Sequence, residues 1–400
     1  MSQPPVSLSA YDHPQQFEPL IPRLISGALA LKSRQVVEAS LRLGGRVHPQ
    51  TAQRLRELVR SMNSYYSNRI EGQSTHPKNI DRALRKDFSD QADIAQRQRI
   101  ALAHIHAERE LEALARPESE VLRADFLQRA HTALYGRLAP DDRTTEDGHL
   151  VQAGVLRQQD VAVGRHQPPT WAAVPAFLAR ADQVYGQPFG LEQQLVAIAC
   201  AHHRFAWVHP FRDGNGRACR LQTHCALLPL SNGLWSVSRG LARDRERYYA
   251  MLAQAEMGRQ GDLDGRGNLS EKALHAWCEY FLSVCEDQVS FLEKLLDLDG
   301  LKKRVASLVR VRQEEFGGAG YRPEAILPLQ HILGLGAVTR ADFVQMTGLE
   351  TRTAQKIISR LVQDGLLQSD SHRGSLSIDF PLDTLHILFP SLYPEANAAV

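Results

Sequence analysis

The sequence predicts a mainly α-helical protein that ends in a small module of helices and a hairpin. Long segments place apolar residues at helical spacing and are rich in Leu, Ala, Arg, Gln and Glu, which favour helix. Strand-like alternation is scarce before residue 300. After residue 300 the pattern changes to two short helices followed by two short strands. These three observations set the fold class.

The helices of the first part follow one another with short connections. The segment up to residue 22 is rich in proline and is expected to be extended. The apolar residues beyond it recur every three or four positions, which places them on one helix face. Helices are expected at 23–43, 50–70, 77–88, 91–115, 122–136, 172–186, 190–207, 215–230, 243–257 and 270–298.

One segment of the first part reads as strand. In VLRQQDVAVG, residues 155–164, Val161 and Val163 alternate with small or polar neighbours, and glycine and two prolines follow. This pattern predicts a short hairpin between helices.

The C-terminal part has its own pattern. A glycine-rich linker, 314–324, precedes a short helix at 339–348, a second helix at 351–364, and two short strands within 366–379. Helix, turn, helix and β-wing in this order resemble a winged helix-turn-helix module, which we place at 301–400.

The second of these helices would be the recognition helix of a DNA-binding module. Its polar residues are Arg352, Thr353, Gln355, Lys356 and Arg360, and Arg373 is expected on the wing. Its apolar face consists of Ala354, Ile357, Ile358 and Leu361. Nearby acidic residues dilute the charge, and winged helices also serve as dimerisation or protein-docking modules. Duplex DNA and a protein therefore both stay open as partners.

Composition excludes several classes of protein. The chain of 400 residues is 43% apolar and 23% charged, with a net charge of +2, so no global field demands nucleic acid or an acidic membrane. No stretch has the length and apolarity of a signal peptide or of a membrane span. The odd, scattered cysteines predict reduced thiols in a cytoplasmic protein without a zinc site. They are Cys200, Cys219, Cys225, Cys278 and Cys285.

The densest polar stretch is HPFRDGNGRACR, residues 209–220. Proline disfavours the helical conformation in the residue before it, so the preceding helix ends at His209. A tight turn follows, and the pattern is helical again from Arg217. The residues Gly214, Asn215 and Gly216 therefore lie at a helix N-terminus, where free amides and the helix dipole favour an anion.

The charged residues around this turn suit a phosphate. Arg217 and Arg220 share one helix face and can bind phosphate oxygens in a bidentate manner. Asp213 is a single carboxylate beside the phosphate site, as Mg²⁺ commonly requires. His209 is the nearby group that titrates near neutral pH and could deprotonate an attacking hydroxyl.

The stretch matches the Fic pattern HxFx[DE]GNGRxxR at every defined position, and the chain resembles Fic-domain proteins over about residues 1–300. The resemblance implies a helical Fic fold in which 155–164 forms a flap that positions the target protein by strand pairing, with 122–136 as the helix before the flap. It implies transfer of AMP from Mg-ATP to a Ser, Thr or Tyr hydroxyl of a protein, with release of pyrophosphate.

The resemblance also implies a role for each motif residue. His209 would be the general base, Phe211 a packing anchor, and Asp213 the magnesium ligand. The anion hole would consist of Gly214, Asn215 and Gly216, and the phosphate ligands would be Arg217 and Arg220. The related Doc kinases carry lysine in place of one motif glycine, so Gly216 favours nucleotidyl transfer. Phosphocholine transferases share the motif, and the transferred group therefore stays open.

A second, shorter resemblance concerns SNRIEGQS at the end of the 50–70 helix. Gly72 suits the position just after a helix, but Glu71 lies at the negative end of the helix dipole, where an acid is unfavourable without a cation. Ser67 to Gly72 resembles the inhibitory motif [ST]xxxE[GN]. The resemblance pairs Glu71 with Arg220, which would turn Arg220 away from the γ-phosphate, while Ser67 would hold the helix end.

The sequence thus predicts three regions, namely 1–110 with the inhibitory helix, 111–300 as the catalytic core, and 301–400. The predicted function is an autoinhibited protein adenylyltransferase that also modifies itself. The alternative is a DNA-binding transcriptional regulator that uses its Fic domain as a nucleotide sensor. His209 and Asp213 favour the enzyme, because sensing needs no base. Reverse removal of AMP and a homodimer stay open.

Overall fold

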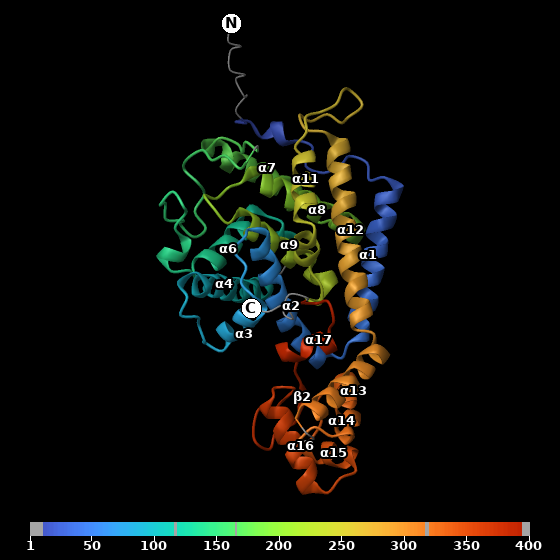
Figure 1. Cartoon of the computed structure of the whole chain (residues 1–400). Coiled ribbons are helices and arrows are strands. Elements are labelled where there is room, and N and C mark those ends of the chain that lie inside the picture. Colours follow the sequence, from blue (N-terminus) through green and yellow to red (C-terminus); the bar gives the residue numbers. More distant parts are fainter. Residues whose placement is uncertain (1–10, 116–117, 165, 317–319, 394–400) are drawn as a thin grey trace.

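A computed structural model describes residues 11–115, 118–164, 166–316 and 320–393. The mainly helical fold class is confirmed (Figure 1). The first helices are α1 (Gly27–Arg46), α2 (Pro49–Ile70), α3 (Pro77–Leu84), α4 (Ala92–Leu114), α5 (Glu118–Val121), α6 (Ala124–Tyr135), α7 (Val174–Tyr185), α8 (Leu191–Val208) and α9 (Asn215–Ser231). These are followed by α10 (Val237–Arg243), α11 (Arg245–Gln254), α12 (Glu271–Leu295), α13 (Leu298–Glu315), α14 (Ile326–Leu335), α15 (Arg340–Thr347), α16 (Thr351–Gln363), β1 (Leu367–Gln368), β2 (Ser377–Ile378) and α17 (Leu385–Leu388).

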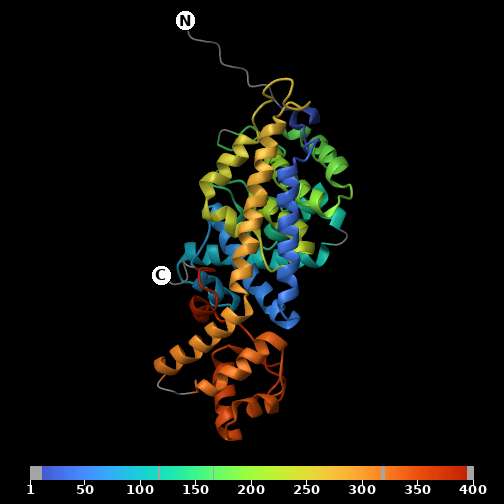
Figure 2. The same ribbon diagram turned by 90° about the vertical axis from the view of Figure 1, so that its right-hand side faces the viewer.

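The helices α8 and α9 form the centre of the main body (Figure 1). From Leu195 to Phe205 every side chain of α8 is buried, and α9 is buried over most of its length. On one side of them the long helices α1 and α12 run side by side (Figure 2). On the other side α2, α4 and α6 pack against α9. The loop that joins α8 to α9, residues 209–214, is thereby fixed at both ends by buried helices.

The N-terminal segment is more structured than predicted. Residues 14–17 form a short 3-10 turn, η1 (Pro14–Phe17), and Phe17 is fully buried. Its ring packs edge-on against Phe177, with centroids 4.9 Å apart, and lies 5.8 Å from Trp207. The prolines at the very start of the sequence lie outside the described residues.

The predicted hairpin at 155–164 is present in a reduced form. One antiparallel bridge joins Val163 to His166, with N···O distances of 3.1 and 2.9 Å. Residues 155–162 form no strand ladder among the described residues. The cause lies with Arg157, whose backbone and side chain bind carbonyl oxygens of the neighbouring loop instead of a partner strand.

Two helix boundaries differ from the prediction in an instructive way. The helix expected at 243–257 is α11, and α10 precedes it without having been predicted. Asp244 separates the two, because its backbone leaves the helical region (φ −133°, ψ 67°) while its side chain accepts a hydrogen bond from the amide of Arg247. The N-cap at Asp244 therefore starts α11 within two residues of its predicted beginning.

The C-terminal part, from α13 to β2, lies below the main body in Figure 1. Its helices α13 and α14 were not predicted, whereas α15, α16, β1 and β2 follow in the predicted order. The two strands pair in antiparallel fashion, and a bridge from Val338 to Leu376 adds a third segment to them. The apolar face of α16 is fully buried, as predicted. Its assignment as a winged helix-turn-helix domain, like the three domain boundaries, stays a prediction.

The chain then returns to the main body. After β2 it forms the short helix α17, which lies beside α2 (Figure 1). Within the described ranges no helix combines the length and apolarity that crossing a bilayer requires. All five cysteines are buried and free of disulfides.

Candidate active site

His209 ends α8 in an unusual backbone conformation. Its φ and ψ are 50° and 60°, in the left-handed region that a non-glycine residue rarely adopts. Arg157 holds this conformation from the opposite segment. Its Nε donates to the carbonyl of His209 at 2.9 Å, and its backbone amide donates to the carbonyl of Pro210 at 2.9 Å. The Arg157 side chain is completely buried, so these bonds are shielded from water.

Asn215 closes the loop from within. Its Oδ1 accepts from the amide of Phe211 at 2.8 Å, and its Nδ2 donates to the carbonyl of the same residue at 2.9 Å. Phe211 is fully buried and stacks on His131 with ring centroids 3.9 Å apart. The Asn215 side chain therefore shapes the loop, and what it offers an anion is its backbone amide.

Gly214 and Gly216 are required by close approaches. Gly214 has φ of 77°, and a Cβ there would lie 2.2 Å from the ring of Tyr135. A Cβ on Gly216 would lie 2.5 Å from Oε1 of Glu71. The helix α9 begins between them without a side-chain cap. Its first amides are thus directed at the space beside the loop, as an anion site requires.

Asp213 lies between two partners. Its Oδ2 accepts from the hydroxyl of Tyr135 at 2.5 Å and from Arg217 at 3.3 Å. Burial opposes ionisation of Asp213, but the charge of Arg217 and the Tyr135 hydroxyl outweigh it and hold the pKa below its usual value. Nearly half of the side chain is exposed, 47%. The carboxylate is therefore charged and accessible, which fits a Mg²⁺ ligand that shares the ion with phosphate oxygens.

Tyr135, at the end of α6, joins the two charged residues. Burial raises the pKa of its hydroxyl, so the group keeps its proton and can donate to Asp213. The same oxygen accepts from Nη2 of Arg217 at 2.6 Å. The sequence reading missed this residue, since it lies 78 positions before Asp213.

Both motif arginines are bound to the end of α2. Arg220 donates from Nε to Oγ of Ser67 at 2.9 Å and from Nη2 to the carbonyl of Ser67 at 3.1 Å, and it forms an ion pair with Glu71. Arg217 donates to Oε1 of Gln73 at 2.7 Å. The sequence reading found Ser67 and Glu71 but missed Gln73, because a glutamine after a helix carries no signal of its own.

The end of α2 has the geometry predicted for it. Gly72 adopts φ of 74°, and the amide of Gln73 donates to the carbonyl of Asn68 at 2.9 Å, which is a Schellman motif. From α11 the hydroxyl of Tyr249 donates to the carbonyl of Ile70 at 3.1 Å. These bonds fix the direction in which Glu71 leaves the helix.

A cavity of about 540 Å³ lies beside His209, Glu71 and Arg220. Its wall also includes the start of α9, part of α11, and Val163, Gly164 and His166. His166 fastens the short hairpin to this wall, because its Nδ1 is 2.9 Å from Glu256 and its Nε2 is 2.7 Å from the carbonyl of Trp207. A cavity of this size accommodates a nucleotide-sized ligand. A larger hollow near Arg56 and Arg60 lies away from the motif loop, and its arginines are already paired.

His209 faces this cavity as a neutral base. The loss of hydration and the nearby His166 lower the pKa of His209 to about 4. The ring is therefore unprotonated at neutral pH and can accept a proton from a hydroxyl.

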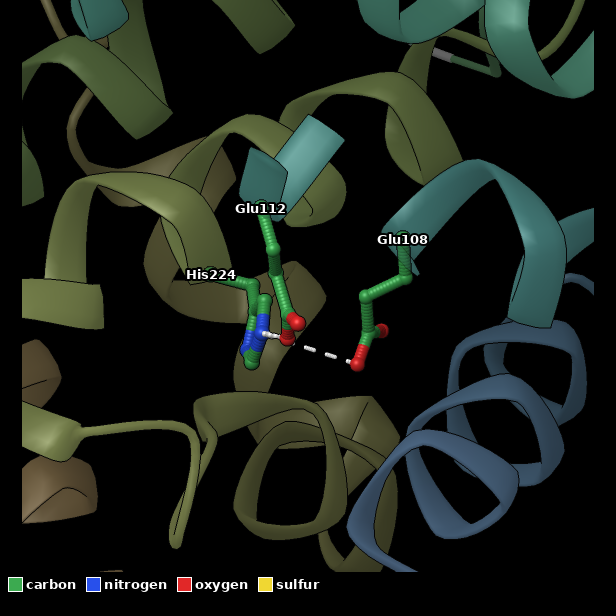
Figure 3. A group of neighbouring side chains, drawn as sticks. All are labelled: Glu108, Glu112 and His224. Carbon is green, nitrogen blue, oxygen red and sulfur yellow. Dashed lines mark hydrogen bonds and ion pairs between the residues drawn. The ribbon is translucent and has the colours of Figure 1, made fainter. Parts of the chain in front are cut away.

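A second cluster of titratable side chains lies behind the site, where Glu108 and Glu112 of α4 point toward His224 of α9 (Figure 3). The Nε2 of His224 is 2.8 Å from Oε1 of Glu112 and 3.5 Å from Oε1 of Glu108. Arg60 forms an ion pair with Glu112, and Asn63 donates to Glu108 at 3.0 Å. Burial raises the pKa of Glu108 to about 7, whereas His224 and Arg60 outweigh burial at Glu112 and lower its pKa to about 2. We therefore interpret the cluster as a buried ion-pair network that joins α2, α4 and α9.

Comparison with known proteins bears on the central part of the chain. Residues 121–227 match the model of the Fic/DOC family. This region is a Fic domain. The helices α6, α8 and most of α9 lie within it, and so does the whole motif loop.

Relatives of the Fic domain carry informative names. The chain is 30% identical over 117 residues to "Protein adenylyltransferase Fic" of Nematostella vectensis. The matched segment covers 29% of this chain and 27% of that protein. The chain is 28% identical over 114 residues to the protein of the same name in Drosophila willistoni, covering 28% and 22%. The matched segment thus spans about a quarter of the length of these relatives.

Solved structures show the same fold. A Fic family protein from Desulfovibrio desulfuricans G20 superposes with a TM-score of 0.50 at 18% identity, covering 90% of this chain and 98% of that one. Fic-1 (residues 134–508) from C. elegans gives a TM-score of 0.52 at 18% identity, covering 66% and 72%. At these identities the likeness concerns the fold of the Fic domain and its surroundings.

Proposed function

We propose that the chain is an autoinhibited protein adenylyltransferase, which transfers AMP from Mg-ATP to a Ser, Thr or Tyr hydroxyl of a protein, itself included. The observation that carries the proposal is the convergence of a neutral His209, the uncapped start of α9 and Arg220 on one cavity. Asp213 in the motif loop and Arg217 on the first turn of α9 are bonded to each other beside them. The names of the relatives of the Fic domain support the same reaction.

The chemistry follows from these positions. His209 accepts the proton of the attacking hydroxyl, whose oxygen forms a bond to the α-phosphorus of ATP. The bond between the α-phosphorus and the bridging oxygen breaks, and pyrophosphate leaves with the electron pair. The amides at the start of α9, together with Arg217 and Arg220, stabilise the negative charge that develops on the phosphate oxygens. Asp213 would hold Mg²⁺, which neutralises part of the charge of the triphosphate when bound.

The brake follows from the partners of Arg220. A guanidinium that donates to Ser67 and pairs with Glu71 is not available to the γ-phosphate. The carboxylate of Glu71 also lies beside Gly216, where an anion would approach the start of α9. The γ-phosphate of ATP must therefore compete with Glu71 for the guanidinium of Arg220. When Glu71 keeps Arg220, ATP binds with its α-phosphorus out of line with the attacking hydroxyl. Gln73 restrains Arg217 in the same way.

The target protein would dock on the flap at 155–164, as the resemblance implies. Support comes from the partly exposed Val163 beside the cavity and from its bridge to His166. An extended segment of the target could continue this single bridge into a longer ladder. Its hydroxyl would then lie near His209.

The second candidate is a DNA-binding regulator in which the Fic domain senses nucleotide. One observation favours it, since α16 exposes Arg352, Gln355 and Lys356 on one face. Arg360, which the sequence also assigned to this surface, is engaged with Asp364 at 2.8 Å and lies over the ring of Phe316. A gel-shift assay with random duplex DNA tests this candidate, and a salt-independent or absent shift speaks against it.

The deciding experiment uses ATP labelled at either end. Wild type, Glu71→Gly and the double variant Glu71→Gly/His209→Ala are incubated with α-labelled or γ-labelled ATP and Mg²⁺. We expect protein-bound label from α-labelled ATP alone, strongest in Glu71→Gly and absent without His209. Label from γ-labelled ATP would indicate phosphate transfer instead, and no label in Glu71→Gly would reject the enzyme.

A further inference from the structure

The end of the described chain packs on the inhibitory helix. Tyr393 stacks on Tyr66 of α2, with ring centroids 6.4 Å apart and planes 10° apart, and meets Tyr65 edge-on at 5.8 Å. The hydroxyl of Tyr66 donates to the carbonyl of Leu392 at 3.4 Å. All three rings are buried, with at most 6% of their surface exposed. We call residues 380–393 the clamp segment.

This contact lies on the helical turn that carries the brake. Ser67, the next residue after Tyr66, faces the other way and accepts hydrogen bonds from Arg220. The turn is thus held between two partners, α9 on one face and the clamp segment on the other. Glu71 cannot move away from Arg220 by a shift of this turn without disturbing the stack on Tyr393.

The clamp segment is itself anchored by α10 of the main body and by α13 of the C-terminal part. Arg239 of α10 donates to the carbonyl of Ser391 at 3.1 Å, and Arg304 of α13 donates to the carbonyl of Leu388. Arg312, also on α13, forms an ion pair with Asp383. Its position against α2 is therefore defined and is not that of a loose tail.

The C-terminal part holds the start of α2 as well. Thr51 donates from Oγ1 to the carbonyl of Leu333 at 3.0 Å, and Oε1 of Gln50 accepts from the amide of Ala337 at 2.6 Å. The start of α2 thus contacts the end of α14 and the loop after it, and the end of α2 contacts the clamp segment. A movement of the C-terminal part would act on the inhibitory helix at both places.

The packing at the clamp is incomplete, as a releasable contact requires. A cavity of about 140 Å³ separates α2 and α3 from Phe380, Leu385 and Tyr393. Tyr393 is therefore not close-packed on the side that faces this cavity.

We propose that the clamp segment is a second lock on the brake, and that its displacement from α2 releases Glu71 from Arg220. The proposal rests on the proposed function, since it names the regulation of the same site. The clamp segment stabilises the conformation in which Glu71 is paired with Arg220. Its loss therefore shifts the population toward the conformation in which this ion pair is broken. The C-terminal part then regulates the active site from outside it.

The test compares Tyr393→Ala with Tyr393→Phe, each in the wild-type and in the Glu71→Gly background, by the rate of self-labelling with α-labelled ATP. Loss of one aromatic pair should raise the wild-type rate about 2- to 10-fold. Tyr393→Phe keeps the stack and should leave the rate near that of wild type. In Glu71→Gly the alanine change should have no further effect, because the brake is already gone. An unchanged wild-type rate, or the same increase in both backgrounds, would overturn the proposal.

A second measurement does not depend on catalysis. Hydrogen exchange of the amides of residues 65–73 should be faster in Tyr393→Ala than in wild type, while exchange in α8 stays the same. Equal exchange at 65–73 would reject the clamp even if no variant labels itself. Absence of labelling in Glu71→Gly together with faster exchange would instead reject the proposed enzyme and leave the clamp standing.

Discussion

Glu71 and Arg220 form an ion pair between residues that lie 149 positions apart in the chain. The Arg220 side chain is 1% exposed, whereas that of Glu71 is 30% exposed. A buried guanidinium needs an anion, because its charge is costly to leave unpaired away from water. The carboxylate of Glu71 and the phosphates of ATP are therefore alternative partners of the Arg220 guanidinium. In the proposed function, inhibition is a competition between these two anions.

Neutralising Glu71 should shift that competition toward ATP. We expect Glu71→Gln to label itself about ten times faster than wild type or more, because a hydrogen bond between charged groups contributes about 1.5–3 kcal/mol. The matched control is Glu38→Gln, an exposed carboxylate on α1. Equal rates for both variants would mean that the ion pair does not limit activity.

The pH profile should reflect the pKa of His209. A base must be unprotonated to act, and the pKa of His209 is lowered to about 4. In Glu71→Gly we expect a rate that changes little between pH 8 and 6 and falls below about pH 5. A half-maximal rate near pH 6.5, the ordinary value for histidine, would contradict this assignment.

Buried neutral histidines should make the fold sensitive to acid. Burial lowers the pKa of His104 and His202 to about 3, and burial lowers that of His131 to about 4. The unfolded chain then binds more protons than the folded one below about pH 6.5, so the free energy of unfolding falls as the pH drops toward 4. Urea titrations at pH 7 and 5 measure this loss. Rates at low pH should be compared only where near-UV circular dichroism shows the fold intact.

Removing the Tyr135 hydroxyl should weaken magnesium binding more than it weakens the fold. In the Glu71→Gly background, Tyr135→Phe should raise the Mg²⁺ concentration for half-maximal rate about tenfold or more, as expected when a metal ligand loses its supporting hydrogen bond. Tyr185→Phe is the control, since its buried hydroxyl donates to the carbonyl of Leu20 at 2.7 Å, away from the motif. A rate loss that excess Mg²⁺ does not restore would point to a structural role alone.

Arg157 should matter for turnover and little for ATP binding. Its side chain holds the carbonyl of His209 in a conformation that costs the backbone free energy. In Glu71→Gly, Arg157→Met should lower kcat about 10- to 100-fold, because unsatisfied carbonyls cost about 1–3 kcal/mol and the base loses its place. The KM for ATP should change less than about threefold. Arg129→Met, at an exposed position, serves as control.

The helices and the motif loop could be predicted from local sequence, whereas contacts between distant segments could not. Pro210, Gly214 and Gly216 impose their backbone requirements on adjacent residues, so the loop and the start of α9 were predictable. Tyr135 and Gln73 reach the site only because α2 and α6 pack on α9, and nothing in their own neighbourhoods indicates this.

Two further predictions were incomplete for related reasons. The alternation at 155–164 suggested two strands, whereas Arg157 satisfies the loop at 209–210 and prevents a ladder. The recognition-helix pattern grouped Arg360 with its neighbours, and it borders the same surface hollow, but its contact with Phe316 could not be read from the sequence. Side-chain type shows what a residue can bind, and only the fold determines which partner is near.

The stack of Tyr393 on Tyr66 joins a helix made early in translation to residues made much later. At about 5–20 residues per second, the motif loop leaves the ribosome roughly ten seconds or more before Tyr393 does. During this interval a nascent chain holds Ser67, Glu71 and Arg220 but lacks the aromatic partner of α2. Nascent chains, and fragments that proteolysis leaves without residues 380–393, would then form the least restrained fraction of this protein in a cell.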